Sequence, residues 1–413
     1  MACVTMGRFE VTKIIKFDAE TSRLYYISTE DVSTPDESNP KLRNLFFVTL
    51  DKSSLRRHAM PSRTCMSCNS GAIIYRECSN FDISTQSTNY FVAKCKGPGV
   101  PYTALYSFND TDMTAPIRFL EENLNLEQKT NRTRLPVIKY RTWRNGVDFQ
   151  TPQSSRVSQK DYTIRAKILL PPNVHLLPKL PIMVHVYAGP GYQFVDNKFK
   201  VDWDDFLVTN RSMAVVYIDG RGSGYDGSDL RFAVNRQLGK YEIDDQIEGV
   251  KLICEDGELS KRLDCSRIAI MGWSYGGYAS AMALTRDEAP FQCGISVAPV
   301  TDWKMYDSVY TERYMGPYDT NKASYDEQSS LIDIAERPYY ISKHDRKYLL
   351  IHGTGDDNVH FRHTALWEEQ LVAAGVQHDV QFYTDQKHGI SDPASQDHLY
   401  RKMTYFLDDC FIK

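Results

Sequence analysis

A glycine-flanked serine, set between a strand-like run and a helix-like run, constrains this chain of 413 residues more than any other feature. Residues Gly272–Gly277 read Gly-Trp-Ser-Tyr-Gly-Gly and match the pattern G-x-S-x-G. The apolar run Arg267–Met271 precedes them, and the helix-forming run Ala279–Leu284 follows. A sharp strand-to-helix turn needs small residues where main-chain atoms approach closely, and it exposes the serine oxygen above a sheet. The alternative is an ordinary turn with an incidental serine at position 274.

The remainder of the chain from about residue 135 alternates strand-like and helix-like runs. The apolar strand candidates are Ile182–Tyr187, Met213–Ile218, Arg267–Met271, Gly294–Ala298 and Tyr348–His352. Residues that share one helical face include Ile247, Val250 and Cys254 in one segment and Leu399, Met403, Phe406 and Leu407 in the last. Nearly continuous apolar strands between helices indicate a parallel sheet covered on both faces. We therefore predict a doubly wound α/β domain over residues 135–413.

Residues 1–134 have a different pattern, with short extended runs, turn residues between them and almost no helical period. Arg23–Thr29, Leu45–Leu50 and Tyr90–Lys94 are examples. Such spacing is typical of antiparallel β-structure, either a sandwich or the blades of a propeller. Two blades would occupy about 80–100 residues, and propellers usually need four to eight blades to close. We expect an incomplete β-structure in this part of the chain.

Two further residues complete a possible catalytic set with Ser274. A serine hydroxyl needs a base to take its proton and a carboxylate to orient that base, and in doubly wound hydrolases the chain order is serine, acid, histidine. Asp356 follows the strand candidate Tyr348–His352, and His388 follows a second one, Gln381–Thr384. Both therefore fall at strand ends, where catalytic groups gather. The competing residues are Asp357 for the acid, and His352 and His360 for the base.

A glycine-rich segment, Gly222–Gly227, matches the dinucleotide-binding pattern G-x-G-x-x-G and follows the strand candidate Met213–Ile218. A dinucleotide site would need a helix to open within that loop. The following residues, Ser228–Phe232, read as irregular, and a clear helix begins only about fifteen residues later. We therefore predict no nicotinamide site and no cofactor.

Cysteine usage points to an oxidising setting. Four of the nine cysteines lie close together, at Cys65, Cys68, Cys78 and Cys95. They fit either a zinc ribbon or disulfide bonds, and their irregular spacing in a strand-rich segment favours disulfides and no metal. Three Asn-x-Ser/Thr acceptor sites for glycans add weak support for a secretory setting. They are Asn109, Asn131 and Asn210.

Composition excludes several classes. Apolar residues at 42% and charged residues at 25% are ordinary globular values. A net charge of −4 without a basic block excludes nucleic acid as an expected partner. No run approaches 18 apolar residues, so we expect no membrane-spanning segment, and the first residues do not have the apolar run of a signal peptide. Together with the incomplete β-structure, this predicts that the natural N-terminus lies upstream.

Several long motifs resemble one enzyme family. They are Val186–Pro190, Asp219–Tyr225, Gly272–Tyr278, Ala298–Val300, Tyr306–Gly316 and His352–His360. These stretches closely resemble the dipeptidyl peptidase IV and fibroblast activation protein subfamily of the prolyl oligopeptidase family of serine peptidases. The resemblance implies an α/β-hydrolase fold over residues 135–413, preceded by the last blades of an incomplete β-propeller over residues 1–134.

The resemblance also assigns roles to residues. Ser274 would be the nucleophile, Asp356 the orienting acid and His388 the base. The Tyr187 hydroxyl and the Tyr275 backbone N–H would form the oxyanion hole. The pocket for proline or alanine would be lined by Tyr275, Val300, Trp303, Tyr306, Tyr310 and Val359, with Asn358 binding a substrate carbonyl. The family's disulfide pattern would join Cys65–Cys68, Cys78–Cys95 and Cys293–Cys410, and leave Cys3, Cys254 and Cys265 free.

By this resemblance, the expected activity is release of dipeptides after proline or alanine through an acyl-enzyme, with peptide substrates, a homodimer and an extracellular or cell-surface setting. The family's paired propeller glutamates, which anchor a free substrate amine, have no counterpart in context. The Glu-Glu pairs present are Glu121–Glu122 and Glu368–Glu369. We therefore expect any activity of this chain to tolerate blocked N-termini. The alternatives are a catalytically silent binding or regulatory protein, and an acylaminoacyl hydrolase or esterase.

Overall fold

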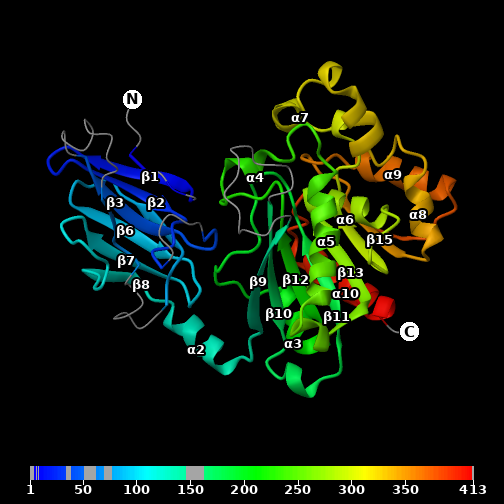
Figure 1. Ribbon diagram of the computed structural model, residues 1–413. Coiled ribbons are helices and arrows are strands. Elements are labelled where there is room, and N and C mark those ends of the chain that lie inside the picture. The colour runs from blue at the N-terminus through cyan, green and yellow to red at the C-terminus, as the bar shows by residue number, and fades with distance from the viewer. Residues whose placement is uncertain are drawn as a thin grey trace. The chain divides into compact units, whose positions relative to one another are not determined.

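Two compact units make up the computed structural model (Figure 1). The structure describes residues 4–5, 7, 9–33, 39–50, 62–68, 77–145 and 162–411, so Cys3 lies outside the described residues. The N-terminal unit contains Met1–Arg134 with two short segments of later sequence, Val195–Val201 and Tyr225–Ser228. The C-terminal unit contains Leu135–Phe194, Asp202–Gly224 and Asp229–Lys413. Each unit has its own hydrophobic core.

The N-terminal unit consists of two four-stranded antiparallel sheets, each with its strands in chain order. The first contains β1 (Val11–Asp18), β2 (Arg23–Ser28), β3 (Asn44–Thr49) and β4 (Arg63–Cys65). The second contains β5 (Phe81–Ser84), β6 (Tyr90–Cys95), β7 (Tyr102–Ser107) and β8 (Arg118–Glu121). Four-stranded meanders of this kind are propeller blades. The expectation of an incomplete propeller is thus confirmed, and the sandwich alternative is wrong.

Aromatic side chains form the core between these two sheets. Tyr25 and Phe91 each contact the ring of Phe108, with ring centroids 4.6 Å and 4.7 Å away, and all three side chains are buried. In β7 the residues alternate strictly between buried and half-buried, the period expected of a strand with one face in a core. The aromatic, alternating runs of the sequence therefore produce the blades.

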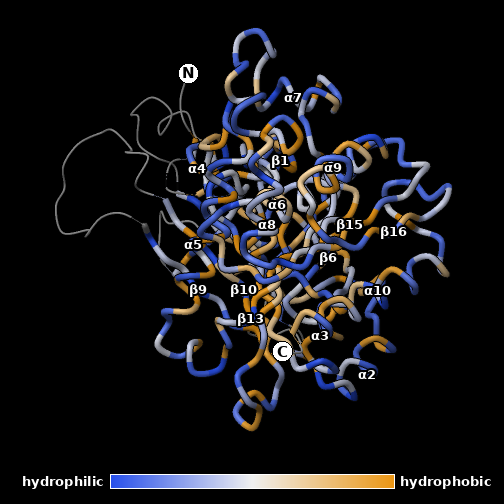
Figure 2. The backbone as a smooth tube through the Cα atoms, turned by 90° about the vertical axis from the view of Figure 1, so that its right-hand side faces the viewer, coloured by the Kyte–Doolittle hydropathy of each residue, from blue (hydrophilic) through white to orange (hydrophobic). Residues whose placement is uncertain are grey.

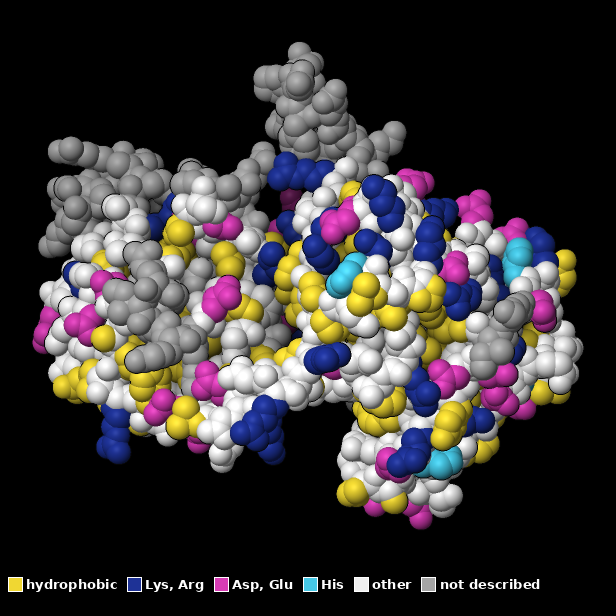
Figure 3. Space-filling model, turned by 90° about the horizontal axis from the view of Figure 1, so that it is seen from below, with side chains coloured by type: hydrophobic (Ala, Val, Ile, Leu, Met, Phe, Trp, Pro, Cys, Tyr) yellow, Lys and Arg dark blue, Asp and Glu magenta, His cyan; other side chains and the backbone are white. Residues whose placement is uncertain are grey.

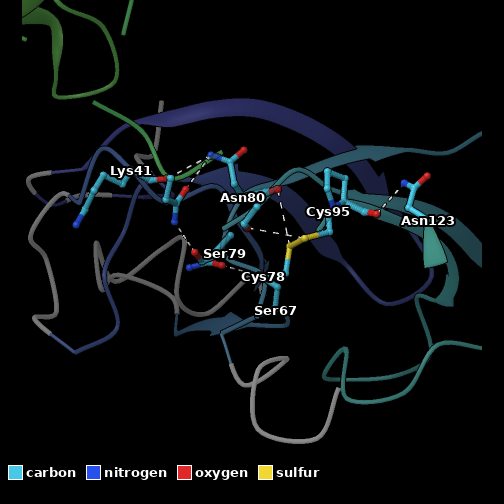
Figure 4. The surroundings of a disulfide bond; sticks show 11 residues. Lys41, Ser67, Cys78, Ser79, Asn80, Cys95 and Asn123 are labelled. Atoms are coloured by element: carbon cyan, nitrogen blue, oxygen red, sulfur yellow. Dashed lines mark hydrogen bonds between the residues drawn. A yellow bond between two sulfur atoms is a disulfide. The ribbon is translucent and has the colours of Figure 1, made fainter. Parts of the chain in front are cut away.

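Two disulfides lie in the N-terminal unit, Cys65–Cys68 and Cys78–Cys95. Figure 4 shows the second bond with Asn80, whose side-chain amide donates to the Lys41 carbonyl at 3.3 Å. Because all four sulfurs are bonded in pairs, the prediction of disulfides is confirmed here and the zinc-ribbon alternative is wrong.

A helix follows the second blade, α2 (Leu124–Arg132), where the sequence showed almost no helical period. None of its residues is buried. Its two leucines, Leu124 and Leu126, are two positions apart and exposed, so the i, i+3, i+4 apolar pattern that would have predicted a helix is missing.

The C-terminal unit is built on one eight-stranded sheet in the order β16-β15-β14-β13-β11-β12-β10-β9. Its strands are β9 (Val137–Asn145), β10 (Tyr162–Leu170), β11 (Leu180–Val186), β12 (Ala214–Asp219), β13 (Leu263–Trp273), β14 (Cys293–Val297), β15 (Lys347–Gly353) and β16 (Asp379–Tyr383). Strand β10 pairs antiparallel with both β9 and β12. All the other neighbouring strands in this order pair in parallel. This is the mostly parallel sheet that the sequence predicts.

Helices cover both faces of this sheet. The helices of this unit are α3 (Trp203–Arg211), α4 (Ser228–Phe232), α5 (Tyr241–Glu255), α6 (Tyr275–Leu284), α7 (Ser308–Met315), α8 (Arg337–Lys343), α9 (Arg362–Ala373) and α10 (Pro393–Phe411). The apolar side chains of α5 and α6 share one core cluster with Ile182 and Val184 of β11, whereas the intervening Met183 is buried outside that cluster. On the other face α3 contacts α10, because the Trp203 indole donates to the Thr404 hydroxyl at 3.0 Å. The doubly wound α/β-hydrolase fold is confirmed.

Hydropathy follows this layering. Figure 2 shows hydrophobic colour along the central strands, such as β10 and β13, and hydrophilic colour over many of the outer loops. The face in Figure 3 carries Lys and Arg side chains interspersed with Asp and Glu. Among the described residues, the structure contains no helix long and apolar enough to cross a membrane.

Two sequence expectations fail in the C-terminal unit. Residues Ser228–Phe232 form the short helix α4 rather than an irregular segment, although none of them is buried. Cys254 and Cys265, expected to stay free, form a disulfide with a Cα–Cα distance of 6.0 Å. The chain reverses through the 3-10 turn Leu259–Lys261, which brings the end of α5 beside the start of β13. The fourth disulfide, Cys293–Cys410, is present as predicted.

Candidate active site

Ser274 occupies the turn between β13 and α6, with φ 61° and ψ −120°. A residue with a side chain rarely adopts this backbone region, and holding it there costs about 1–3 kcal/mol. The turn is fixed by its surroundings, because the Ser274 N–H donates to the Val297 carbonyl at 2.8 Å. The serine therefore lies at the carboxyl end of the parallel strands, at the first turn of a helix.

The neighbouring glycines are required by close main-chain approaches. A Cβ atom on Gly272 would lie 2.1 Å from the Gly276 carbonyl oxygen, and one on Gly276 would lie 2.2 Å from the Val186 carbonyl oxygen. Real Cβ atoms do not approach main-chain oxygens this closely. Positions 272 and 276 therefore have to be glycine for the serine turn to pack against β11.

Asp356 lies just after β15 and its side chain is fully buried. One carboxylate oxygen accepts the backbone N–H groups of Asn358 at 2.9 Å and Val359 at 3.0 Å. The other lies 2.7 Å from Nδ1 of His388 and 3.2 Å from Nε2 of His352. Burial opposes ionisation, but these hydrogen bonds outweigh it and hold the pKa of Asp356 well below its usual value.

His388 lies in the loop after β16, and its side chain remains 21% exposed. Because the ionised Asp356 can only accept, Nδ1 of His388 carries a proton, and in the neutral ring the lone pair is therefore on Nε2. The loop is tied to the serine turn, since the Trp273 indole N–H donates to the His388 carbonyl at 2.9 Å. The residues before the serine thus fix the position of the histidine.

His352, one of the competing bases, has a structural position. It is fully buried, and its Nε2 lies 2.8 Å from the Val359 carbonyl, which can only accept. Nε2 therefore carries the proton and shares it between Val359 and Asp356, while Nδ1 accepts from the Thr364 hydroxyl at 2.7 Å. This tautomer makes His352 a donor to Asp356, a supporting contact that the sequence did not predict.

Asp357 and His360, the other two candidates for the acid and the base, do not take part in the contact between Asp356 and His388. Asp357 has a side chain that is 64% exposed and forms an ion pair with Lys387 at 2.9 Å. His360 is exposed beyond the same turn. The structure therefore brings Asp356 and His388 together, and places Asp357 at the surface.

The expected oxyanion-hole residues flank the elbow. Tyr275 is the first residue of α6, and the first N–H groups of a helix have no acceptor within the helix. Tyr187 directly follows β11, and its ring centroid lies 6.0 Å from that of Tyr275. Burial raises the pKa of the Tyr187 phenol, so its proton stays available for donation.

The glycine-rich loop supports the segment that carries Tyr187. The Gly191 N–H donates to the Gly222 carbonyl at 2.8 Å, and the Gly224 N–H donates to the Tyr192 carbonyl at 2.9 Å. A Cβ atom on Gly224 would lie 2.3 Å from the Gly191 carbonyl oxygen. Close loop-to-loop packing is therefore a sufficient reason for these glycines.

The expected pocket residues form a connected aromatic group. Trp303 contacts four rings, with centroids 5.3 Å from both Tyr275 and Tyr278 and 5.9 Å from both Tyr306 and Tyr310. Val300 and Val359 are buried in the same core cluster. The Tyr306 hydroxyl donates to the Asn358 side-chain oxygen at 2.7 Å. Asn358 is exposed, and this contact uses its acceptor but not its amide N–H donors.

Glu242, in the first turn of α5, is a buried residue that the sequence reading missed. It is 1% exposed and accepts a hydrogen bond from the Tyr275 hydroxyl at 2.8 Å. Burial raises its pKa to about 7. Acidic residues are common in the first turn of a helix, where they interact favourably with its N-terminus, so nothing in the local pattern distinguishes Glu242 as buried. No group of three His, Cys, Asp or Glu side chains within the described ranges is placed to hold a metal ion.

A half-buried serine on a strained strand-to-helix turn, with an aspartate–histidine pair in loops at the same edge of a mostly parallel sheet and one of these loops bonded to Trp273, is typical of the α/β-hydrolase class. Comparison with known proteins agrees. Residues 199–413 match the prolyl oligopeptidase family, and residues 2–102 match the dipeptidyl peptidase IV N-terminal region. The chain belongs to the prolyl oligopeptidase family.

Similar proteins share nearly the whole chain. Dipeptidyl peptidase 4 of Bos taurus is 37% identical, and prolyl endopeptidase FAP of Homo sapiens is 35% identical, each over 99% of this chain and 48% of its own length. The crystal structure of Porphyromonas gingivalis dipeptidyl peptidase 4 matches with a TM-score of 0.80 and 28% identity, over 98% of this chain and 50% of that one. This chain thus spans about half the length of these relatives.

Proposed function

We propose that this chain carries the catalytic part of a serine peptidase that cleaves after proline or alanine near peptide N-termini, as a dipeptidyl peptidase does. The single observation that supports it most is the 2.7 Å contact between Asp356 and His388, made in a loop bonded to the turn that holds Ser274. The similarity to dipeptidyl peptidase 4 and prolyl endopeptidase FAP supports the choice of substrate class.

The proposed reaction begins with attack of the Ser274 oxygen on the scissile carbonyl carbon. His388 takes the hydroxyl proton at Nε2, while Asp356 holds the opposite N–H and stabilises the resulting imidazolium. The C–N bond then breaks, the leaving amine receives that proton, and an ester between Ser274 and the acyl group remains. Water, deprotonated by His388, hydrolyses the ester and restores the hydroxyl.

The negative oxygen of the tetrahedral intermediate would be bound by the Tyr275 backbone N–H and the Tyr187 hydroxyl. The Tyr275 N–H is fixed by the first turn of α6, and the half-buried Tyr187 ring packs against Tyr192 and Tyr275, so both donors need little reorganisation. The loss of one such donor typically costs about 10²–10³ in kcat. This assigns Tyr187 a role in the transition state rather than in substrate binding.

The aromatic group would form the pocket for the residue before the scissile bond. Flat aromatic walls from Trp303, Tyr306 and Tyr310 suit a pyrrolidine ring, and buried Val300 and Val359 limit its depth. Asn358 would donate its amide N–H to a substrate carbonyl, because Tyr306 already occupies its oxygen.

Hydrolysis of dipeptidyl anilides by the purified chain tests the proposal. Gly-Pro-anilide should be cleaved, Gly-Leu-anilide should be cleaved at least 100-fold more slowly, and Ser274→Ala should cleave neither. Because the family's paired glutamates have no counterpart in context, acetyl-Gly-Pro-anilide should also be cleaved, and a strict requirement for a free amine would contradict that expectation. Cleavage of the acetylated substrates alone would instead indicate an acylaminoacyl hydrolase. Cleavage of simple esters without any preference for proline would contradict the peptidase assignment.

We further propose an extracellular or cell-surface setting and a homodimer. The four disulfides and the exposed acceptors Asn109, Asn131 and Asn210 support the setting. Exposed aromatic side chains on α3 and α10, among them Phe206 and Tyr405, line a groove that supports the homodimer. Peptide N-glycosidase treatment and sedimentation analysis of protein secreted from eukaryotic cells test the two proposals separately.

A further inference from the structure

A buried carboxyl lies behind the candidate pocket and takes no part in the proposed reaction. One Glu242 oxygen accepts the Tyr275 hydroxyl at 2.8 Å and also the Gly239 backbone N–H. The other oxygen has no hydrogen-bond partner among the described residues. A buried acid with one unpartnered oxygen is costly to keep, so its contact with Tyr275 calls for a functional explanation.

The Tyr275 ring that it holds is a wall of the proposed pocket. The ring contacts Trp303 on one side, with centroids 5.3 Å apart, and meets Tyr278 edge-to-face at 5.5 Å. Ring contacts of this kind are apolar and have broad geometric preferences, so they fix the position of the Tyr275 hydroxyl less closely than a hydrogen bond does. The hydrogen bond at the hydroxyl fixes the far end of the ring, and α5, which carries Glu242, packs against α6, which carries Tyr275.

We propose that Glu242 is a specificity-determining positioning residue: through the Tyr275 hydroxyl it holds the pocket wall rigid, and so favours proline over alanine before the scissile bond. The inference rests on the proposed function for the identity of the pocket's occupant. A rigid wall benefits a ring that fills the pocket more than a methyl group that touches it little. Loosening the wall should therefore lower the preference for proline more than it lowers turnover of alanine substrates.

A double-mutant cycle on selectivity tests this. The measured quantity is the ratio of kcat/KM for Gly-Pro-anilide to that for Gly-Ala-anilide. Glu242→Leu and Tyr275→Phe should each lower the ratio about fivefold, the effect expected of one hydrogen bond, and the double variant should lower it no further. Glu242→Gln keeps an oxygen acceptor and should preserve the ratio within twofold. Glu255→Gln, exposed at the end of the same helix, is the matched control.

Two results would overturn the inference: single variants that leave the ratio unchanged, or effects of the two single variants that multiply in the double variant. If Glu242→Leu does not fold, Tyr275→Phe and Glu242→Gln decide alone, because only the former should lower the ratio.

A binding measurement separates this inference from the proposed function. An aminoacyl-pyrrolidide needs the pocket but no reactive serine, so its affinity can be measured by tryptophan fluorescence in a Ser274→Ala background. Glu242→Leu and Tyr275→Phe should each weaken pyrrolidide binding about fivefold. If they do so although the wild-type chain hydrolyses no anilide, the inference is retained and the peptidase assignment is rejected. Hydrolysis with no effect of Glu242→Leu and Tyr275→Phe on pyrrolidide binding, or no binding to the folded protein, would reject the inference.

Discussion

Replacing Glu242 by glutamine should remove a pH-dependent loss of stability from the C-terminal unit. Burial raises the pKa of this carboxyl to about 7 from an ordinary value of 4.5. Below pH 4.5 the acid is protonated in both the folded and the unfolded chain, so it adds no pH dependence. As the pH rises from 4.5 to about 7, the unfolded chain releases the proton first, and the folded state loses stability relative to it.

The size of this loss follows from the span of about 2.5 pH units at about 1.4 kcal/mol per unit, which is about 3 kcal/mol. Little discount for solvent screening is needed, because Glu242 is 1% exposed. The other titratable groups that face the carboxyl are the same in wild type and in Glu242→Gln, so their contribution cancels in the comparison. They are Asp245 of α5, which is paired with Arg221, and the phenols Tyr275, Tyr278 and Tyr310.

Urea unfolding at pH 5, 6, 7 and 8, followed by tryptophan fluorescence, measures this effect. All five tryptophans, from Trp143 to Trp367, lie in the C-terminal unit, so the signal reports that unit. The free energy of unfolding of Glu242→Gln, relative to wild type, should rise by about 2–3 kcal/mol between pH 5 and pH 8, slightly less than the full span, because the unfolded chain has already begun to titrate at pH 5. Parallel curves for the two proteins would refute the assignment of a raised pKa, and Glu255→Gln should show such parallel curves.

Three further changes test the site. Asp356→Asn should lower kcat/KM for Gly-Pro-anilide by about 10⁴-fold through the wrong histidine tautomer, whereas Asp357→Asn should stay within twofold; equal effects would contradict the assignment. Gly276→Ala should destabilise the fold by more than about 2 kcal/mol in urea unfolding, because its Cβ would meet a β11 carbonyl, while Gly257→Ala, in open space, should be near neutral. Trp273→Phe should lower kcat up to about tenfold with KM unchanged, since it removes the bond to the histidine loop; an unchanged kcat would argue against that positioning.

Local sequence rules sufficed where one short segment determines the structure. The serine elbow depends on glycines and strand and helix runs within about 20 residues, and all of these can be identified in the sequence. The strands β11 to β16 were equally visible, because a parallel sheet buried on both faces needs continuous apolar runs. The two strands at the antiparallel edge, β9 and β10, were not predicted. The roles of Ser274, Asp356 and His388 remain predictions until activity is measured.

Contacts between distant segments were not accessible in this way. The Cys254–Cys265 bond depends on the reversal between α5 and β13, and the family pattern used for pairing did not include it. The Glu242–Tyr275 bond joins the first turns of two helices 33 residues apart, and no periodicity marks it. His352 was considered as a base, but only its buried position shows that it donates to Asp356.

Reaction of the folded chain with a fluorophosphonate probe tests the central claim most directly, because the probe modifies a serine only when a neighbouring base activates it. The account predicts one adduct by intact mass, located at Ser274 by peptide mapping, absent in Ser274→Ala and strongly slowed in His388→Ala. Absence of any adduct on folded protein, or modification at another serine, would contradict it.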